Sequence, residues 1–248
     1  MQDKKAAVVL AAGKGKRMKS NLPKVLHEIG GKPMIKILIE KLIQLEFEKI
    51  IVIIGYEGEK VQTVLADYPV EFVWQREQLG TGHAVMMAKE AMKDFDGITL
   101  VALGDVPFLS ELSIDILFDM FKKTNASACC LSAILQDPSG YGRIVRKPDT
   151  NILEAIVEHK DASEEILKIN EINSGTFCFD NKKLFEYLEK IDNNNEQGEY
   201  YLTDTIKLMH DSQLSVSVVA TENPNELRGI NSVEQLDELA AIFFDRLN

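Results

Sequence analysis

Ala6-Ala-Val-Val-Leu-Ala-Ala-Gly-Lys-Gly-Lys-Arg-Met18 is the segment of this 248-residue sequence that says most about its fold. Its first half is a continuous run of small and β-favouring residues, which is typical of a strand buried on both faces. Gly13 ends the run, and glycines and cations follow at once. A strand that leads into a glycine-rich loop indicates an α/β sheet, and such sheets bind ligands at the carboxyl ends of their strands.

The following segments repeat this alternation of buried strand and amphipathic helix. The strands predicted in the first half are 6–12, 49–54, 70–74 and 98–103, and the helices are 33–47, 57–66, 80–93 and 112–123. Strands that are apolar on both faces and separated by helices predict a mainly parallel sheet covered on both sides. With right-handed crossovers, the fold class is α/β, a three-layer, doubly wound (Rossmann-like) sheet.

After residue 125 the pattern becomes less regular. Short strands are predicted at 128–135, 142–146, 152–157, 176–179 and 214–220, and helices at 182–190, 202–210 and 233–244. Turn signals at 137–140 and 147–149 separate the first of these strands. We therefore expect a small antiparallel or mixed extension of the sheet.

Composition and charge exclude several classes of protein. No apolar run approaches the roughly 18–20 residues that cross a bilayer, and the polar N-terminus lacks the order of a signal peptide, so a cytoplasmic protein with no membrane partner is expected. The net charge of −11 argues against nucleic acid. Five cations nevertheless fall between Lys14 and Lys24, which indicates either a site for a small polyanion or a solvated basic loop. Cys129, Cys130 and Cys178 have no metal-ligand spacing and are predicted to be buried core thiols.

The loop after the first strand has features of a phosphate site. Small residues at Ala11, Ala12, Gly13 and Gly15 would let backbone N–H groups approach a ligand, and Lys14, Lys16 and Arg17 could neutralise a triphosphate. The loop is neither a P-loop nor a full dinucleotide fingerprint, and a plain glycine turn is the alternative. Lys24, after Pro23, is either a phosphate contact or a surface lysine.

The loop and the motifs that follow it carry a family resemblance. Leu10-Ala-Ala-Gly-Lys-Gly-Lys-Arg-Met18 and Leu22-Pro-Lys24 resemble the signature of enzymes that couple a nucleoside triphosphate to a sugar phosphate. Further motifs follow in order at 75–84, 104–107, 140–144, 158–162, 171–175, 198–204 and 229–231. Together they resemble, over essentially the whole chain, the uridylyltransferase domain of the bacterial N-acetylglucosamine-1-phosphate uridyltransferases.

This resemblance implies a reaction and a cofactor. UTP and N-acetylglucosamine 1-phosphate would give UDP-N-acetylglucosamine, a peptidoglycan precursor, and pyrophosphate, with Mg²⁺ as the cofactor. It implies Arg17, Lys24 and Asp105 as catalytic residues, and Asp105 with Asn231 as the metal ligands. From the residues alone, Asp105 could instead cap a turn or helix, and Asn231 could be a turn residue.

The resemblance also implies which residues hold the two substrates. The nucleotide would lie on Leu10, Ala11, Ala12, Gly13, Gly15, Gln75, Gln78, Gly80 and Thr81, and the sugar on Gly142, Glu158 and Asn173. Asn231, as a metal ligand, is also counted among the binding residues. A glutamine amide both donates and accepts, which suits the uracil edge. Gly80 and Gly82 are expected to permit close approach, Thr81 is alternatively an N-cap, and His83 is interpreted as structural.

A single domain of residues 1–248 is predicted, with a nucleotide-binding half at 1–125 and a sugar-binding half at 126–248. The C-terminal β-helix of the bifunctional relatives is not found in this sequence, so we expect no acetyltransferase activity, and the oligomeric state stays open. Three positions depart from the family: Lys16 for a usual Thr, Leu103 for a frequent Tyr, and Ser174 for a common Thr. The alternatives are transfer to glucose or galactose 1-phosphate, use of dTTP or CTP, and a non-catalytic nucleotide-sugar sensor.

Overall fold

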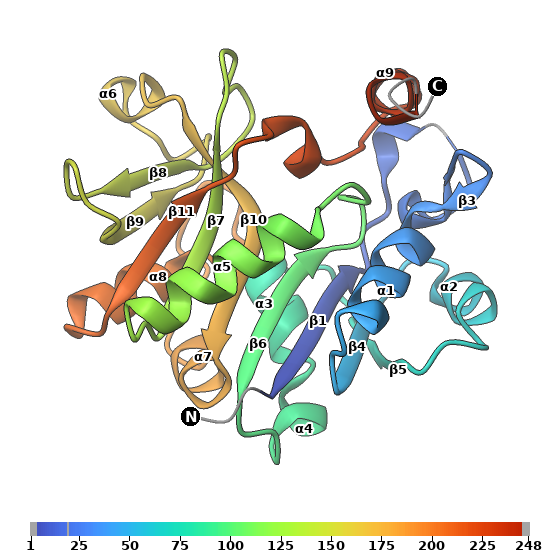
Figure 1. Cartoon of the computed structure of the whole chain (residues 1–248), viewed down its shortest axis with the longest axis horizontal. Coiled ribbons are helices and arrows are strands. Elements are labelled where there is room, and N and C mark those ends of the chain that lie inside the picture. Colours follow the sequence, from blue (N-terminus) through green and yellow to red (C-terminus); the bar gives the residue numbers. More distant parts are fainter. Residues whose placement is uncertain (1–3, 19, 245–248) are drawn as a thin grey trace.

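The computed structural model describes residues 4–18 and 20–244, and its centre is a set of parallel strands. Strand β1 (Lys5–Ala11) lies between β4 (Lys49–Ile54) and β6 (Ile98–Leu103), and β5 (Glu71–Trp74) follows β4 at the edge. In register, Val8 lies opposite Ile51 on one side and Val101 on the other. All four strands are parallel, so their carboxyl ends meet at one edge of the sheet (Figure 1).

The other half of the sheet contains the predicted antiparallel extension. Strand β10 (Glu171–Asp180) runs antiparallel to β6 and to β7 (Ala128–Ile134), while β11 (Val216–Ala220) is parallel to β7. Strands β8 (Arg143–Arg146) and β9 (Leu153–Val157) form an antiparallel pair on β10. Nine of the described strands therefore make one mainly parallel sheet, which confirms the predicted fold class.

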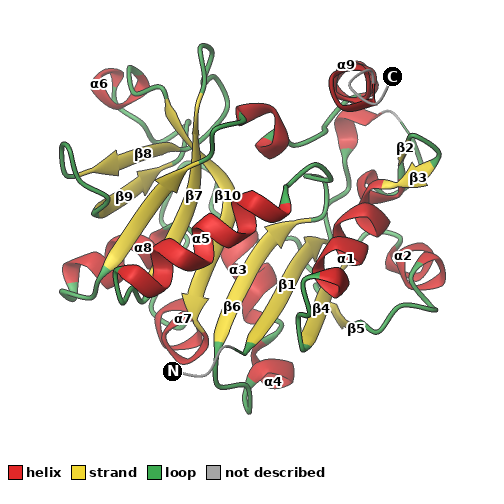
Figure 2. Ribbon diagram, in the orientation of Figure 1, coloured by secondary structure: helices red, strands yellow, loops and turns green. Residues whose placement is uncertain are grey.

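Helices cover both faces of the sheet and give three layers (Figure 2). Helices α1 (Met34–Gln44), α2 (Gly58–Val64) and α5 (Glu111–Lys123) pack on one face. The opposite face carries α3 (Thr81–Met86), α4 (Lys89–Met92), α7 (Asn181–Leu188) and α8 (Asp204–Asp211). Within the part of the chain that is described, no helix combines the length and apolarity that a membrane span requires.

The side chains of β1 show why this strand is apolar throughout. Ala7 and Val9 belong to the core beneath α1 and α5, whereas Ala6 and Val8 belong to the core beneath α3 and α7. All four are fully buried. Burying a valine side chain contributes roughly 1.5–3 kcal/mol, so both faces favour placing β1 in the centre of the sheet.

Smaller elements complete the fold. They are the hairpin of β2 (Glu28–Ile29) and β3 (Lys32–Pro33), the helices α6 (Glu164–Leu167) and α9 (Val233–Phe244), and the 3-10 turns η1 (Lys16–Met18), η2 (Lys24–Leu26) and η3 (Pro224–Leu227). Helix α9 lies beside the hairpin, at the carboxyl-end side of the parallel strands (Figure 1).

The three cysteines are buried in the sheet, as predicted. Cys129 on β7 lies opposite Cys178 on β10. Burial raises the pKa of Cys129 to about 12, so its sulfur stays a thiol at neutral pH and acts as a small apolar core group.

Candidate active site

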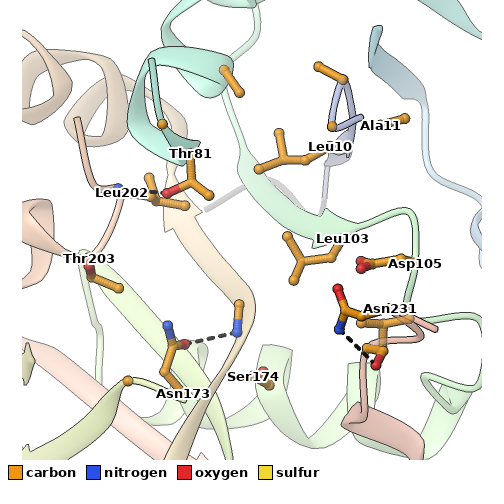
Figure 3. A pocket seen from close by; sticks show the side chains of 18 of the residues that line it. Leu10, Ala11, Thr81, Leu103, Asp105, Asn173, Ser174, Leu202, Thr203 and Asn231 are labelled. Atoms are coloured by element: carbon orange, nitrogen blue, oxygen red, sulfur yellow. Dashed lines mark hydrogen bonds between the residues drawn. The ribbon is translucent and has the colours of Figure 1, made fainter. Parts of the chain in front are cut away.

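A cavity of about 460 Å³ opens at the carboxyl ends of the central strands. It is lined by fourteen of the sixteen residues expected from the sequence: Leu10, Ala11, Ala12, Gly13, Lys24, Gln75, Gln78, Gly80, Thr81, Asp105, Gly142, Glu158, Asn173 and Asn231. Figure 3 shows Asp105 and Asn231 at one end of the cavity and Thr81, Thr203 and Asn173 at the other. The chain therefore brings motifs from its whole length to one site.

At the charged end, one cation bridges two oxygen groups. The ammonium of Lys24 donates to Oδ2 of Asp105 and to Oδ1 of Asn231, the latter at 3.0 Å. The side chains of Lys24 and Asp105 are 18% and 11% exposed. Partial burial weakens solvent screening, so this end of the cavity holds charges that act strongly on a ligand.

Backbone contacts fix both oxygen groups. Asp105 lies two residues after the end of β6, and its carbonyl accepts from Ile230 N at 3.0 Å. The Asn231 amide nitrogen donates to Gly229 O at 3.2 Å, which turns Oδ1 toward Asp105 and Lys24. The segment before α9 is thereby attached to the end of β6.

This oxygen pair fits a hard divalent cation. Two protein oxygens already converge on the ammonium of Lys24, so their position suits a positive charge. Among residues 4–18 and 20–244, no group of three or more His, Cys, Asp or Glu side chains could hold a metal. One or two protein oxygens, completed by phosphate and water, are typical of Mg²⁺ sites.

The loop after β1 differs from the expectation in two residues. Gly15 and Arg17 do not line the cavity. Gly15 has φ +59°, and a Cβ there would lie 2.7 Å from the Cβ of Lys24, so this glycine packs against the lysine. Arg17 is exposed in η1. The side chain of Lys16 lies outside the described part of the structure.

Gln75 and Gln78 line another part of the cavity wall. Nε2 of buried Gln75 donates to Gly80 O at 3.1 Å and lies 3.1 Å from Nδ1 of His83. Gln78 donates to the carbonyl of Gln75 at 3.2 Å. These contacts orient Gln75 with its Oε1 available as an acceptor, and they give His83 a structural role, as expected.

Gly80 and Gly82 lie in close contact with another segment of the protein. A Cβ on Gly80 would lie 2.5 Å from Tyr200 O, and one on Gly82 would lie 2.9 Å from the same oxygen. The close approach expected at these glycines is therefore made by the segment around Tyr200. Thr81 is the first residue of α3 and its hydroxyl accepts from Leu202 N at 3.1 Å, so it is not the N-cap.

At the far end, Glu158 and Asn173 present polar groups. Thr203 donates to Glu158 Oε1 at 3.1 Å, and burial raises the pKa of the Glu158 carboxyl above its ordinary value. Oδ1 of Asn173 accepts from Gly175 N at 2.9 Å, which leaves the amide nitrogen pointing into the cavity (Figure 3). The carbonyl of Gly142 accepts from Asn173 N at 2.9 Å, which joins the motif at 140–144 to the motif at 171–175.

Several lining residues received no role from the sequence. Among them are Tyr141, Leu202, Thr203, Glu199 and Gly229, together with apolar Leu103. Most belong to the quoted motifs at 140–144, 198–204 and 229–231, so the motifs as blocks already contained the signal. Leu103 packs on Gly175. A Cβ on Gly175 would lie 2.6 Å from Cδ1 of Leu103, and the φ of Gly175 is +76°.

Comparison with known proteins agrees with this geometry. The MobA-like NTP transferase domain family matches residues 7–201. The chain is 47% identical over 245 residues to the bifunctional protein GlmU of Listeria monocytogenes serotype 4a, and 46% identical over 244 residues to that of Geobacillus sp. strain WCH70. These matches cover 99% and 98% of the chain, which spans 53% of the length of each relative.

Solved structures give the same fold. The crystal structure of a UDP-glucose pyrophosphorylase complexed with UDP-glucose superposes with a TM-score of 0.74 at 17% identity, covering 98% of this chain and 99% of that one. The apo form of a UDP-glucose pyrophosphorylase has a TM-score of 0.75, also at 17% identity, and covers 99% and 100%. With its sheet, its cavity and the match over residues 7–201, the chain belongs to the MobA-like NTP transferase domain family.

Proposed function

We propose that this chain is a cytoplasmic uridylyltransferase that makes UDP-N-acetylglucosamine and pyrophosphate from UTP and N-acetylglucosamine 1-phosphate. One observation carries the proposal: residues far apart in the sequence form one cavity, with Lys24, Asp105 and Asn231 at one end and further hydrogen-bonding groups at the other. The likeness to the GlmU proteins over the whole chain supports the choice of base and sugar.

The reaction depends on electrostatic stabilisation of the phosphates more than on a general base. An oxygen of the sugar phosphate, already an anion, attacks the α-phosphorus of UTP, and pyrophosphate leaves with the bonding electrons. Two polyanions must be held in line, so positioning and electrostatic stabilisation dominate. In this proposal Lys24 contacts the transferring phosphate, and Arg17 reaches the triphosphate from the exposed turn η1.

Asp105 and Asn231 would hold Mg²⁺, which when bound neutralises negative charge on the phosphates. The carboxylate of Asp105 and the amide oxygen of Asn231 keep their positions through Ile230 and Gly229. The backbone of Ala11, Ala12 and Gly13 borders the phosphates, and open space around Gly13 leaves room for them.

The remaining wall would select the base and the sugar. Oε1 of Gln75 accepts from the uracil N3–H, because its Nε2 is already committed to Gly80. Glu158 accepts from sugar hydroxyls, and the amide nitrogen of Asn173 donates to the N-acetyl carbonyl or a hydroxyl.

Pyrophosphate release tests the proposal. UTP and Mg²⁺ are supplied with N-acetylglucosamine, glucosamine, glucose or N-acetylgalactosamine 1-phosphate. We expect preference for N-acetylglucosamine 1-phosphate, with activity lost in EDTA and in Asp105→Ala. Preference for another sugar would reject the assigned sugar site. UTP binding without turnover on any sugar would instead favour a nucleotide-sugar sensor.

A further inference from the structure

Glu226 in η3 is a buried carboxylate outside the cavity. It is 3% exposed and accepts from Ser110 N at 3.0 Å. Its second oxygen accepts from the hydroxyls of Ser113 and Thr221, which lie 3.0 Å from each other. A buried carboxylate is costly unless hydrogen bonds satisfy it, and three donors do so here.

These donors come from two separate elements. Ser110 is the N-cap of α5 and also accepts from Ser113 N at 3.1 Å, whereas Thr221 follows β11. The N-terminus of a helix carries partial positive charge and stabilises an anion. Lys41 on α1 also lies within electrostatic range of Glu226 and donates to Leu109 O. Glu226 therefore attaches η3 to the first turn of α5.

The chain runs from Glu226 directly into the charged end of the cavity. Leu227 is buried and lines the cavity, and fully buried Ile230 donates to Asp105 O at 3.0 Å. Asn231 follows, with its Oδ1 on Lys24. Arg228, which lies between Glu226 and Asn231 in the chain, donates two hydrogen bonds of 2.8 Å to Glu238 on α9. The segment that ends at Asn231 is therefore held to α9 by Arg228 and to α5 by Glu226.

We infer that Glu226 is a positioning residue that holds Asn231 opposite Asp105 and thereby sets the affinity of the site for a divalent cation. The inference rests on the proposed function for the identity of the site. Partners that orient metal ligands typically change metal affinity about 10–100-fold when they are replaced. Glu226 acts on Asn231 through the backbone of residues 227–230, so we expect an effect at the lower end of that range.

Glu226→Gln tests this role with nearly unchanged shape. Mn²⁺ is titrated in the presence of UTP and followed by water-proton relaxation, which separates protein-bound Mn²⁺ from the free Mn²⁺–UTP complex. We expect the dissociation constant for Mn²⁺ to rise about tenfold. The affinity for UTP in EDTA and the KM for the sugar phosphate should change less than about twofold, within ordinary context effects.

Asn181→Ala is the matched control for a loss of stability. Asn181 is 3% exposed and forms hydrogen bonds with the Thr99 hydroxyl and with the carbonyls of Met92 and Phe95. Thr99 lies at the amino-terminal end of β6, away from the cavity, and Met92 and Phe95 precede that strand. We expect it to lower the melting temperature without changing Mn²⁺ affinity. If Glu226→Gln behaves in the same way, with lower stability and unchanged metal affinity, the positioning role is wrong.

A second variant keeps the test decisive if Glu226→Gln does not fold. Thr221→Val removes one hydroxyl donor from Glu226 and should weaken Mn²⁺ binding in the same direction, by roughly threefold for the loss of one bond. Unchanged Mn²⁺ affinity in a folded Thr221→Val protein would overturn the inference. The Mn²⁺ titration needs no turnover, so an inactive wild-type protein would reject the proposed function without deciding this point.

Discussion

The ammonium nitrogen of Lys24 lies 3.0 Å from Oδ1 of Asn231, although 207 positions separate the two residues in the sequence. The same ammonium donates to Asp105. The two groups assigned to a metal are thus occupied by a lysine of the protein itself. A metal ion and the Lys24 ammonium compete for the same oxygens, and a bound triphosphate offers the ammonium another partner.

Lys24→Met should therefore separate metal binding from turnover. Losing the ammonium removes its repulsion of the divalent cation and frees both oxygens, so Mn²⁺ should bind the nucleotide-free protein at least about tenfold more tightly, a change of about 1.4 kcal/mol. Turnover should fall by roughly 10²–10³-fold, as for other lost transition-state contacts. Electron paramagnetic resonance of Mn²⁺ and pyrophosphate release give the two values.

Lys93→Met is the control for the Lys24 prediction. Lys93 is exposed and pairs with Glu90 on the surface, so its loss should leave both quantities unchanged. Weaker Mn²⁺ binding in Lys24→Met would mean that the lysine supports the metal site and does not compete for it.

Gly15→Ala tests whether the loop positions Lys24. The new Cβ would meet Lys24 Cβ at 2.7 Å, in addition to the roughly 1–2 kcal/mol that alanine costs at positive φ. Gly31→Ala is the matched control, because its φ is +77° and nothing lies within 4 Å of the added Cβ. We expect both variants to lose the stability that positive φ costs, with a further loss in Gly15→Ala from the contact with Lys24. A fall in kcat of tenfold or more, about 1.4 kcal/mol, should occur only in Gly15→Ala. Equal kcat values in the two variants would refute the positioning of Lys24 by Gly15.

Glu158→Gln should affect the sugar substrate selectively. A hydrogen bond to a charged group contributes about 1.5–3 kcal/mol, so kcat/KM for N-acetylglucosamine 1-phosphate should fall roughly 10–100-fold, while the KM for UTP stays within about twofold. Asp161→Asn is the control, because exposed Asp161 lies near Glu158 but does not line the cavity. An equal effect on both substrates would show that Glu158 supports the fold and does not bind the sugar.

The parallel strands were predictable because burial on both faces leaves a continuous apolar run. Strands β4 and β6 have the predicted bounds, 49–54 and 98–103. Strand β10 is longer than its predicted core of 176–179, because polar residues occupy its first half. Glu171 is satisfied there by Ser132 and Arg146, partners that no local pattern reveals. The two-residue strands of the β2–β3 hairpin are too short to show a period.

The composition of the cavity was predictable only through ordered motifs. Local sequence indicates that Asp105 follows a buried strand, but not that Asn231 lies beside it. The contact of the segment around Tyr200 with Gly80 and Gly82 could not be predicted either. A glycine in the sequence indicates that another group can approach closely, but not which group does so. Glu226 resembles an ordinary surface glutamate in sequence, and its role follows from donors on two distant elements.

Asp204 makes stability depend on pH. Burial, with Asp192 and Asp161 nearby, raises the pKa of this carboxyl from 3.8 to about 6. The folded protein therefore retains a proton that the unfolded chain has released, so this group favours folding below about pH 4 and loses that contribution as the pH rises through about 6. Relative to wild type, Asp204→Asn should gain stability above pH 6, by about 1–2 kcal/mol, because the carboxyl is only half-buried and solvent screens part of its interactions.

Melting curves of wild type and Asp204→Asn between pH 4 and 8 measure this difference. For a chain of this size each kcal/mol corresponds to about 2–4 °C, so the variant should melt several degrees higher at pH 7.5 and near the wild-type temperature at pH 4. Asp119→Asn, at an exposed position on α5, should show no such crossover. A constant offset between wild type and Asp204→Asn at every pH would mean that the substitution acts through packing around α8, because a titrating carboxylate must produce a difference that grows between pH 4 and 6.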